Sequence, residues 1–188
     1  MAHRRGPDTE RLILRAFEPR DADAFFRLNS DARVMRYTGE PPMPSVEAAR
    51  DAIVAYPDFD THGFGRWACV LKELGEDSPP IGFCGLKFLD EVDEVDIGYR
   101  FLPAYWGRGL ATESARASIE FGFVTLSLEH VCAFVLADND GSIRVLNKLR
   151  MTRAADIMYD GQAAQRWTVT RSDWFGSSPR NGGETPSP

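Results

Sequence analysis

The sequence is poor in lysine, cysteine and histidine. Only three of its 22 basic residues are lysines, and acidic residues outnumber basic ones, which gives a formal net charge of −6. A protein that binds nucleic acid mainly through broad electrostatic attraction needs the opposite charge, so the composition argues against that class. The arginines that supply most of the positive charge have fork-shaped donors suited to phosphate and carboxylate.

The three cysteines, Cys69, Cys84 and Cys132, are widely spaced in apolar, strand-like segments. Neither a CxxC pair nor metal-ligand spacing is present, so we expect buried free thiols in a reducing compartment and no metal site. The sequence also lacks an apolar run as long as a membrane span, and residues 1–7 are basic without a following hydrophobic region. We therefore expect a cytoplasmic protein that does not bind membranes.

A single domain is expected from the length and composition. The chain has 188 residues, of which 43% are hydrophobic, enough for one sizeable core. From residue 176 the chain consists of Gly, Ser, Pro and polar residues, with too little apolar surface to fold alone. We predict a flexible N-terminus over 1–8, one domain over 9–175 and a disordered tail over 176–188.

Hydrophobic periodicity predicts strands and helices in alternation. Strands are expected at residues 9–17, 65–72, 80–88, 94–101, 129–136, 154–159 and 166–171, the last two connected through Asp160 and Gly161. Helices are expected at residues 21–29, 46–55, 110–124 and 142–149, with a short helix or turn at 31–37. The sheet around 65–101 is expected to be antiparallel, whereas the strand–helix–strand order over 94–136 implies a right-handed crossover between parallel strands.

A glycine-bearing turn joins the strand at 94–101 to the helix at 110–124. Gly107 and Gly109 permit backbone conformations that a Cβ forbids, and the first helical amides have no internal partners. The helix dipole makes this end partly positive, so a phosphate or pyrophosphate is the expected ligand. The alternative is a plain turn before a surface helix. Neither GxxxxGK[ST] nor GxGxxG occurs, which excludes two well-known nucleotide motifs.

Five segments in order resemble the GNAT N-acetyltransferase superfamily, in the branch that includes the ribosomal-protein alanine N-acetyltransferases. They read TERLILRAFEPRDADAFF, DARVMRYTG, IGFCGL, DIGYRFLPAYWGRGLATESA and ADNDGSIRVLNKL, and the resemblance covers roughly residues 9–174. It implies an α+β GNAT fold, with a mixed, mostly antiparallel sheet of about seven strands, about four flanking helices and a splayed parallel strand pair at the cofactor site. It also implies transfer of acetyl from acetyl-coenzyme A to a primary amine.

The resemblance assigns cofactor-binding residues to three segments. The superfamily's R/Q-x-x-G-x-G/A motif falls on residues 106–111, and the amides at about 108–112 would hold the pyrophosphate of acetyl-coenzyme A. The preceding strand, 97–101, would pair its backbone with the pantetheine arm. The expected contacts are Tyr99, Phe101, Trp106, Gly107, Arg108, Gly109, Leu110, Ala111, Thr112, Asn139, Ser142 and Asn147.

A second family pattern, N-x-x-S before an apolar helix and K-x-G-F, begins at Asn139 and departs from the family at its end. Arg150 stands where glycine is usual, so the exit from this helix lacks the residue best suited to a left-handed conformation. Leu146 stands where many relatives have a tyrosine that protonates the departing thiolate. Ser142 is the acid at the matching place in this branch; the alternative is that it only caps its helix.

Acetyl transfer to an amine needs a neutral nucleophile, a polarised thioester carbonyl and a route for protons, without a covalent enzyme intermediate. Asp96 lies where branch relatives often have Glu, and it is the first candidate for the base or amine anchor, with Glu94 and Asp160 as backups. Each is otherwise a solvated carboxylate. Tyr37 and Trp67 are candidate walls of the acceptor pocket, or else core aromatics.

The same motifs also fit a catalytically silent coenzyme A-binding module that senses the cofactor or mediates association. Within the enzyme class, the acceptor is a protein N-terminus or a small amine such as an amino acid, a polyamine or an amino-sugar drug. The acidic net charge favours cationic acceptors through electrostatic steering. Dimers occur in the branch, so a homodimer is an open alternative.

Overall fold

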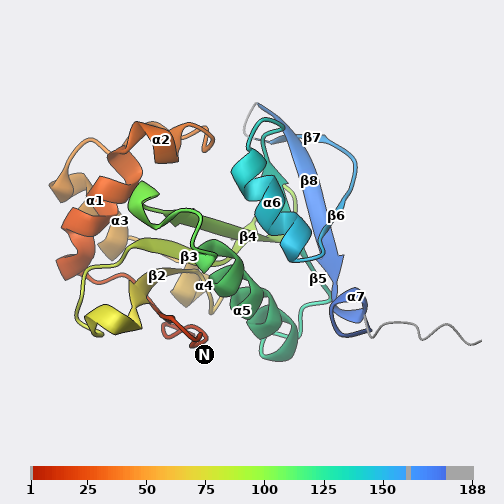
Figure 1. Ribbon diagram of the computed structural model, residues 1–188, viewed down its shortest axis with the longest axis horizontal. Helices are drawn as coiled ribbons and strands as arrows, with labels where there is room; N and C mark the ends of the chain where they lie inside the picture. Colours follow the sequence, from red (N-terminus) through yellow and green to blue (C-terminus); the bar gives the residue numbers. More distant parts are fainter. Residues whose placement is uncertain (1, 160–161, 177–188) are drawn as a thin grey trace, which may run out of the picture.

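The computed structural model describes residues 2–159 and 162–176 and shows an α+β fold (Figure 1). The strands are β1 (Leu12–Arg15), β2 (Arg66–Leu71), β3 (Gly82–Leu89), β4 (Glu94–Phe101), β5 (His130–Val135), β6 (Thr152–Arg153), β7 (Ile157–Tyr159) and β8 (Gln162–Thr170). The helices are α1 (Ala22–Ser30), α2 (Ala32–Met35), α3 (Val46–Val54), α4 (Asp58–Thr61), α5 (Leu110–Val124), α6 (Asp140–Lys148) and α7 (Arg171–Gly176). Short 3-10 helices occupy Pro19–Asp21, Lys72–Leu74 and Pro103–Tyr105.

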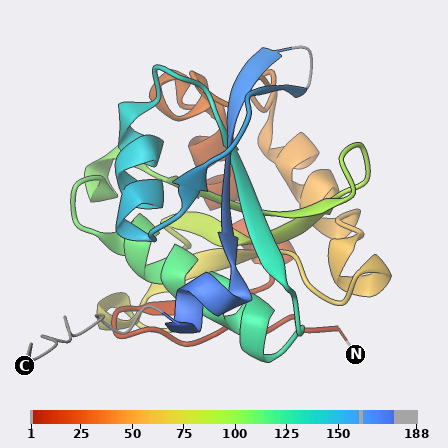
Figure 2. The ribbon, with the colours of Figure 1, turned by 90° about the vertical axis from the view of Figure 1, so that its right-hand side faces the viewer.

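One eight-stranded sheet has the order β1-β2-β3-β4-β5-β8-β6, with β7 paired to β8. Among the described strands, every pairing is antiparallel except that of β4 with β5. These two parallel strands are in register at one position, Asp96 opposite Cys132. Figure 2 shows β5 and β8 running steeply across the direction of β2, β3 and β4. The predicted mixed, mostly antiparallel sheet with a splayed parallel pair is confirmed.

Different helices cover the two faces of the sheet. Directly opposed residues in antiparallel strands point to the same face, so Trp67 shares one face with Tyr99, and Arg66 shares the other with Gly98. The first face is covered by α5, where the Phe121 ring meets the Trp67 ring edge-on at 5.4 Å. Helix α6 lies beside α5, while α1 and α3 cover the second face (Figure 2).

Helix α5 has the bounds predicted from its apolar spacing. Leu110, Ile119 and Phe123 are fully buried against the sheet, and burial of each such side chain contributes about 1.5–3 kcal/mol. Its N-cap, Gly109, has φ 81° and ψ 1°, a left-handed conformation that glycine adopts without steric penalty. The turn and the helix therefore depend on different residues, glycine for the direction of the chain and apolar side chains for packing.

The N-terminal residues differ from the expectation of a loose segment over 1–8. The His3 amide donates to the Gly63 carbonyl at 2.6 Å, and the Gly6 amide donates to the Leu14 carbonyl at 2.9 Å. The Trp67 indole N–H also donates to the His3 carbonyl, at 2.9 Å. Two of these contacts join residues at least 60 positions apart and none follows a periodic pattern, which is why sequence reasoning does not find them.

The C-terminal part also departs from the sequence-based bounds. Strand β8 begins at Gln162 rather than at residue 166, and Arg171 begins α7 instead of ending a strand. Helices α4 and α7, which the sequence analysis does not predict, are too short to show helical periodicity. The connection at 160–161 and the tail over 177–188 lie outside the described residues.

The exit of α6 keeps its left-handed turn without glycine. Arg150 has φ 58°, a region that disfavours residues with a Cβ. The Met151 amide donates to the Leu146 carbonyl at 3.1 Å, which closes the end of the helix. The departure from the family pattern at residues 150–151 therefore leaves the local turn in place.

Candidate active site

The turn between β4 and α5 presents an open backbone. Gly107 and Gly109 have φ 74° and 81°, and a Cβ added to Gly107 would meet no atom within 4 Å. The Trp106 indole N–H donates to the Phe101 carbonyl at 2.6 Å and so fixes the turn to the end of β4. Gly109 provides no side chain to cap the first amides of α5, which leaves them for an external anion.

A cavity of about 950 Å³ begins at this turn and reaches the opposite face of the sheet. It lies where β4 and β5 separate, so it has walls from both faces: α5 and α6 on one side, α1 to α3 on the other. The predicted site residues that line it are Tyr37, Asp96, Tyr99, Phe101, Trp106, Gly107, Gly109, Leu110, Ala111, Thr112, Asn139 and Ser142.

Four predicted site residues do not line this cavity. Arg108 points back over the Tyr105 ring, 5.5 Å from its centroid. The Asn147 side chain donates to the Ile143 carbonyl of its own helix at 2.9 Å. Trp67 and Glu94, the other two, are held elsewhere by the contacts described below.

Trp67 is fully buried on the face covered by α5 and belongs to the core. Glu94 lies on the expected face of β4, and both of its carboxylate oxygens accept hydrogen bonds from Arg166 of β8, one of them from Nε at 3.0 Å. Burial alone would raise the pKa of Glu94, but the hydrogen bonds from Arg166 and Cys132 and the positive charge of Arg166 together lower the pKa below its ordinary value. Asp160, the other backup base, lies outside the described residues.

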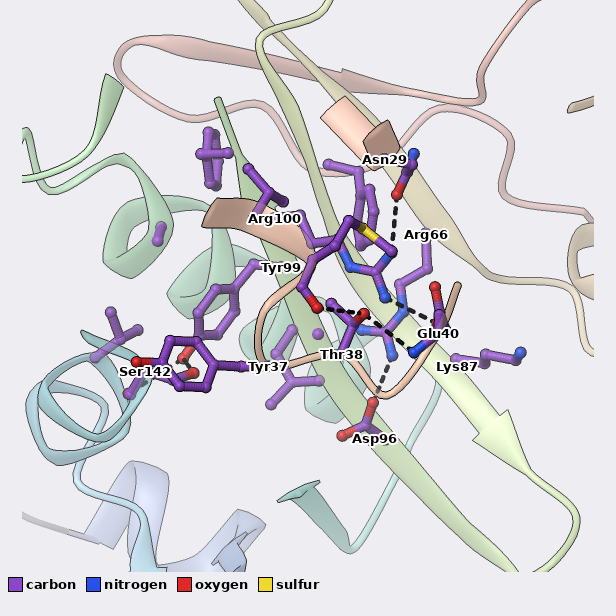
Figure 3. A pocket seen from close by; sticks show the side chains of 18 of the residues that line it. Asn29, Tyr37, Thr38, Glu40, Arg66, Lys87, Asp96, Tyr99, Arg100 and Ser142 are labelled. Carbon is purple, nitrogen blue, oxygen red and sulfur yellow. Dashed lines mark hydrogen bonds and ion pairs between the residues drawn. The ribbon is translucent and has the colours of Figure 1, made fainter. Parts of the chain in front are cut away.

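Asp96 lines the cavity as one half of a buried ion pair. Its Oδ2 accepts a hydrogen bond from Nη2 of Arg66, whose Nη1 donates to the Gly85 carbonyl at 2.9 Å (Figure 3). Arg66 lies over Gly98, where an added Cβ would be 1.8 Å from Nη1. Glycine at this position of β4 therefore makes the space in which the guanidinium reaches the carboxylate.

Tyr99 and Ser142 form a hydroxyl pair on the side of the cavity lined by α5 and α6. Their oxygens are 2.8 Å apart, and Figure 3 shows both side chains at the edge of α6. Burial raises the pKa of the Tyr99 phenol above its ordinary value, so the phenol stays protonated at neutral pH. The N-cap of α6 is Asn139, whose Oδ1 accepts from the Ser142 amide at 3.1 Å. The Ser142 hydroxyl is thus free of the capping role that the sequence left open.

Sequence reasoning missed a polar group on the other side of the cavity. Arg100 of β4 donates to Asn29 Oδ1 at 2.8 Å and forms an ion pair with Glu40 at 2.8 Å. Lys87 of β3 lies opposite Asp96 in the register of the two strands. Alternation along β4 puts Arg100 on the same face as Asp96, which is the signal that could have identified it.

The three cysteines are buried, as predicted. None of them lines the cavity. Burial raises the pKa of all three thiols, so they are protonated and unreactive at neutral pH. The cavity therefore receives no thiolate nucleophile from them.

The sequence matches the family described as the acetyltransferase (GNAT) domain over residues 11–152. The chain belongs to the GNAT acetyltransferase family. It is therefore an acetyl-coenzyme A-dependent N-acetyltransferase, and the cavity is the candidate site of that activity. Among the described residues, no helix is long and apolar enough to cross a membrane.

Three known proteins illustrate the similarity. An uncharacterized N-acetyltransferase p20 of Bacillus licheniformis is 36% identical over 75% of this chain and 79% of its own length. The spermidine N(1)-acetyltransferase of Escherichia coli strain K12 is 27% identical over 82% of this chain and 80% of its own. The structure of Mycobacterium smegmatis RimJ in complex with CoA-disulfide has a TM-score of 0.72 and 19% identity, covers 89% of each chain, and supports the fold.

Proposed function

We propose that this protein transfers the acetyl group of acetyl-coenzyme A to a primary amine by direct attack, without a covalent enzyme intermediate. The observation that carries the proposal is the cavity that runs between the separated strands β4 and β5. It joins the open turn at the start of α5 with the buried Asp96 carboxylate on the other face of the sheet. A donor and an acceptor that enter from opposite faces would meet between the two strands.

The donor side fits acetyl-coenzyme A. The uncapped first amides of α5 would hold its pyrophosphate, and the two glycines before them allow close approach. The backbone of β4 beyond Asp96, which does not pair with β5, would pair with the pantetheine arm. When bound, the coenzyme supplies an activated acetyl thioester next to β4. Backbone amides of this strand would stabilise negative charge on the thioester carbonyl oxygen.

Two groups of the chain would move protons in the reaction. Among the described residues, Asp96 Oδ1 has no hydrogen-bond partner, while Oδ2 accepts from Arg66, so Oδ1 would accept a proton from the attacking amine or anchor that amine. The Ser142 hydroxyl, with the protonated Tyr99 phenol beside it, would donate a proton toward the departing sulfur. The cysteines are buried and protonated, which supports direct attack on the thioester.

The acceptor is a small amine or a protein N-terminus. The first class is supported by the similarity to a protein named as a spermidine acetyltransferase. The second is supported by the resemblance of the five sequence segments to the ribosomal-protein alanine N-acetyltransferases. Tyr37, which is half-buried at the cavity wall, would contact either acceptor.

The proposal is tested by incubating the protein and acetyl-coenzyme A with a panel of small amines and N-terminal peptides. We expect amine-dependent release of free thiol, and a mass increase of one acetyl group on the amine in mass spectrometry. Acetyl on a side chain of the enzyme in the absence of an amine would contradict direct attack. Tight coenzyme A binding with no thiol release for any amine would contradict the transferase proposal itself.

A further inference from the structure

We propose that the preferred acceptor is a small amine that also carries a carboxylate, and that Arg100 binds this carboxylate in the place that Glu40 now occupies. This inference rests on the proposed function, because it names the class of amine that the transferase would use. It starts from the ion pair on the acceptor side of the cavity between Arg100, which the fold holds in place by other contacts, and Glu40, which is exposed.

Arg100 is the partner of this ion pair that other contacts hold in place. Its Nη1 donates to Asn29 Oδ1 at 2.8 Å, and its guanidinium carbon lies 5.3 Å from the centroid of the Phe83 ring. Its side chain is 17% exposed. The other terminal nitrogen, Nη2, forms the ion pair with Oε1 of Glu40 at 2.8 Å, and Figure 3 shows Arg100 between Asn29 and Glu40. One edge of the planar group is therefore fixed by the fold, and the other already holds a carboxylate.

Glu40 is the exposed partner. Its side chain is 55% exposed and comes from the segment between α2 and α3. The backbone of this segment is held by hydrogen bonds from the Met43 amide to the Asn29 carbonyl at 2.8 Å and from the Glu40 amide to the Thr38 hydroxyl at 3.2 Å, whereas the Glu40 carboxylate itself is exposed. An ion pair with a half-exposed partner contributes little net stability, because water competes for both groups. A ligand carboxylate of the same shape can therefore displace Glu40 at low cost.

The charges on this wall favour an acceptor with a negative group. Asp96 is already paired with Arg66. Among the described residues, Lys87 has no ion-pair partner, although it lies half-buried at the cavity. Once Glu40 is displaced, neither the Arg100 guanidinium nor the Lys87 ammonium has an ion-pair partner among the described residues. Arg4 and Arg33 also line the cavity, but each has its own carboxylate partner.

This local charge argues against the cationic acceptors that the overall net charge favours. A polyamine has no group to replace Glu40 and would bring further positive charge beside Arg100 and Lys87. The same wall is otherwise largely apolar, with Phe25, Val34 and Ile53 among its residues. An amine, a carboxylate and an apolar substituent together describe a hydrophobic amino acid.

The inference is tested with matched acceptors that differ in the carboxylate: leucine, methionine and phenylalanine against their amides. Steady-state thiol release would be measured for the wild type, Arg100→Gln, Arg100→Lys and Glu40→Gln. We expect Arg100→Gln to raise the KM of the acids about 10-fold or more, as one charge-assisted hydrogen bond implies, with little change for the amides. Comparing each variant with wild type removes the difference in amine basicity between acids and amides.

Glu40→Gln is the most informative variant, because the direction in which it changes KM distinguishes the possible roles of Glu40. We expect it to lower the KM of the acids, because the competing carboxylate is gone. If it raised the KM of acids and amides alike, Glu40 would be an amine anchor and the inference would be overturned. Arg33→Gln is the matched control, since Arg33 lines the same cavity but pairs with Asp31, and it should leave the preference unchanged.

A binding measurement separates failure of this inference from failure of the proposed function. The coenzyme A-bound protein would be titrated calorimetrically with N-acetylleucine and with N-acetylleucinamide. Selective binding of the acid that is lost in Arg100→Gln, together with no turnover on any amine, would support the carboxylate site and contradict the transferase proposal. Turnover on amines without any carboxylate preference would overturn the carboxylate site alone, and Arg100→Lys, which keeps the charge, controls for misfolding of Arg100→Gln.

Discussion

At the scale of single residues, the centre of the site is a unit made from three strands. Arg66 comes from β2, the carbonyl of Gly85 from β3, and Asp96 and Gly98 from β4. Removal of one partner from a buried ion pair costs about 3–5 kcal/mol, because the other charge stays buried without compensation. The glycine, the arginine and the aspartate therefore depend on one another, although Arg66 is 30 residues from Asp96 in the sequence.

Asp96→Asn is expected to lower kcat by about 100-fold or more, the usual contribution of a general base, while acetyl-coenzyme A affinity changes little. The amide cannot take a proton from the amine. Steady-state rates across pH and calorimetric binding of acetyl-coenzyme A measure the two effects. Glu94→Gln is the matched control on the same face of β4, where the carboxylate pairs with Arg166 outside the cavity. Equal losses in both variants, or an unchanged rate in Asp96→Asn at every pH, would contradict the role.

Sequence reasoning identifies Asp96 but not the arginine that pairs with it. Alternation along a strand predicts which side chains share a face, so Glu94 and Asp96 are placed correctly relative to each other. Their partners, Arg66 and Arg166, are 30 and 72 residues away, and only the register between strands brings them together. For the same reason the sequence leaves Trp67 open between the acceptor pocket and the core, and the structure shows it in the core.

At the scale of secondary structure, the start of α5 would determine the proposed donor site. The spacing of apolar residues predicts this helix to the residue, and the glycine pattern predicts the turn. Short helices such as α4 escape prediction, since one turn is too brief for a period to show. The long elements of the fold are thus readable from the sequence, and the short connections that shape the acceptor side are not.

Gly109→Ala tests the proposed anion-binding turn. An alanine at φ 81° costs about 1–2 kcal/mol, and its Cβ would lie 3.6 Å from Arg11, an ordinary contact. We expect a lower melting temperature together with at least a several-fold weaker affinity for coenzyme A. Gly75→Ala carries at least as large a backbone strain, since φ 92° and ψ 155° lie in a region essentially restricted to glycine, and it does so in a turn outside the cavity with nothing within 4 Å of the new Cβ. It should lower stability and leave coenzyme A binding intact; a matching loss of affinity there would indicate general unfolding instead.

At the scale of the whole molecule, the sheet has two parts that meet at β4 and β5. Strands β1 to β4 form one part, and β5, β8 and β6 form the other, with one register pair between them. The cavity lies along the line where they separate, so a molecule bound there touches both parts. Its binding would therefore stabilise the contact between the two parts.

Coenzyme A is expected to protect both parts from hydrogen exchange. At about 100 times its Kd a ligand adds ~2.7 kcal/mol of stability, which corresponds to a rise in melting temperature of roughly 5–10 °C for a chain of this size. We expect slower amide exchange in the second half of β4 and the first turn of α5, and also at the start of α6. Protection limited to α5 would show that the pantetheine arm does not lie between the strands.

The residues proposed to select the acceptor and those proposed to bind the donor also lie in different parts of the sequence. The residues that would select the acceptor, among them Asn29, Glu40 and Arg66, come before residue 101, whereas the turn and helices that would hold the donor follow it. Related enzymes can thus exchange their first hundred residues and keep their coenzyme. A chimera that joins the N-terminal part of one relative to the C-terminal part of another at Leu102 should acquire the amine preference of its N-terminal parent.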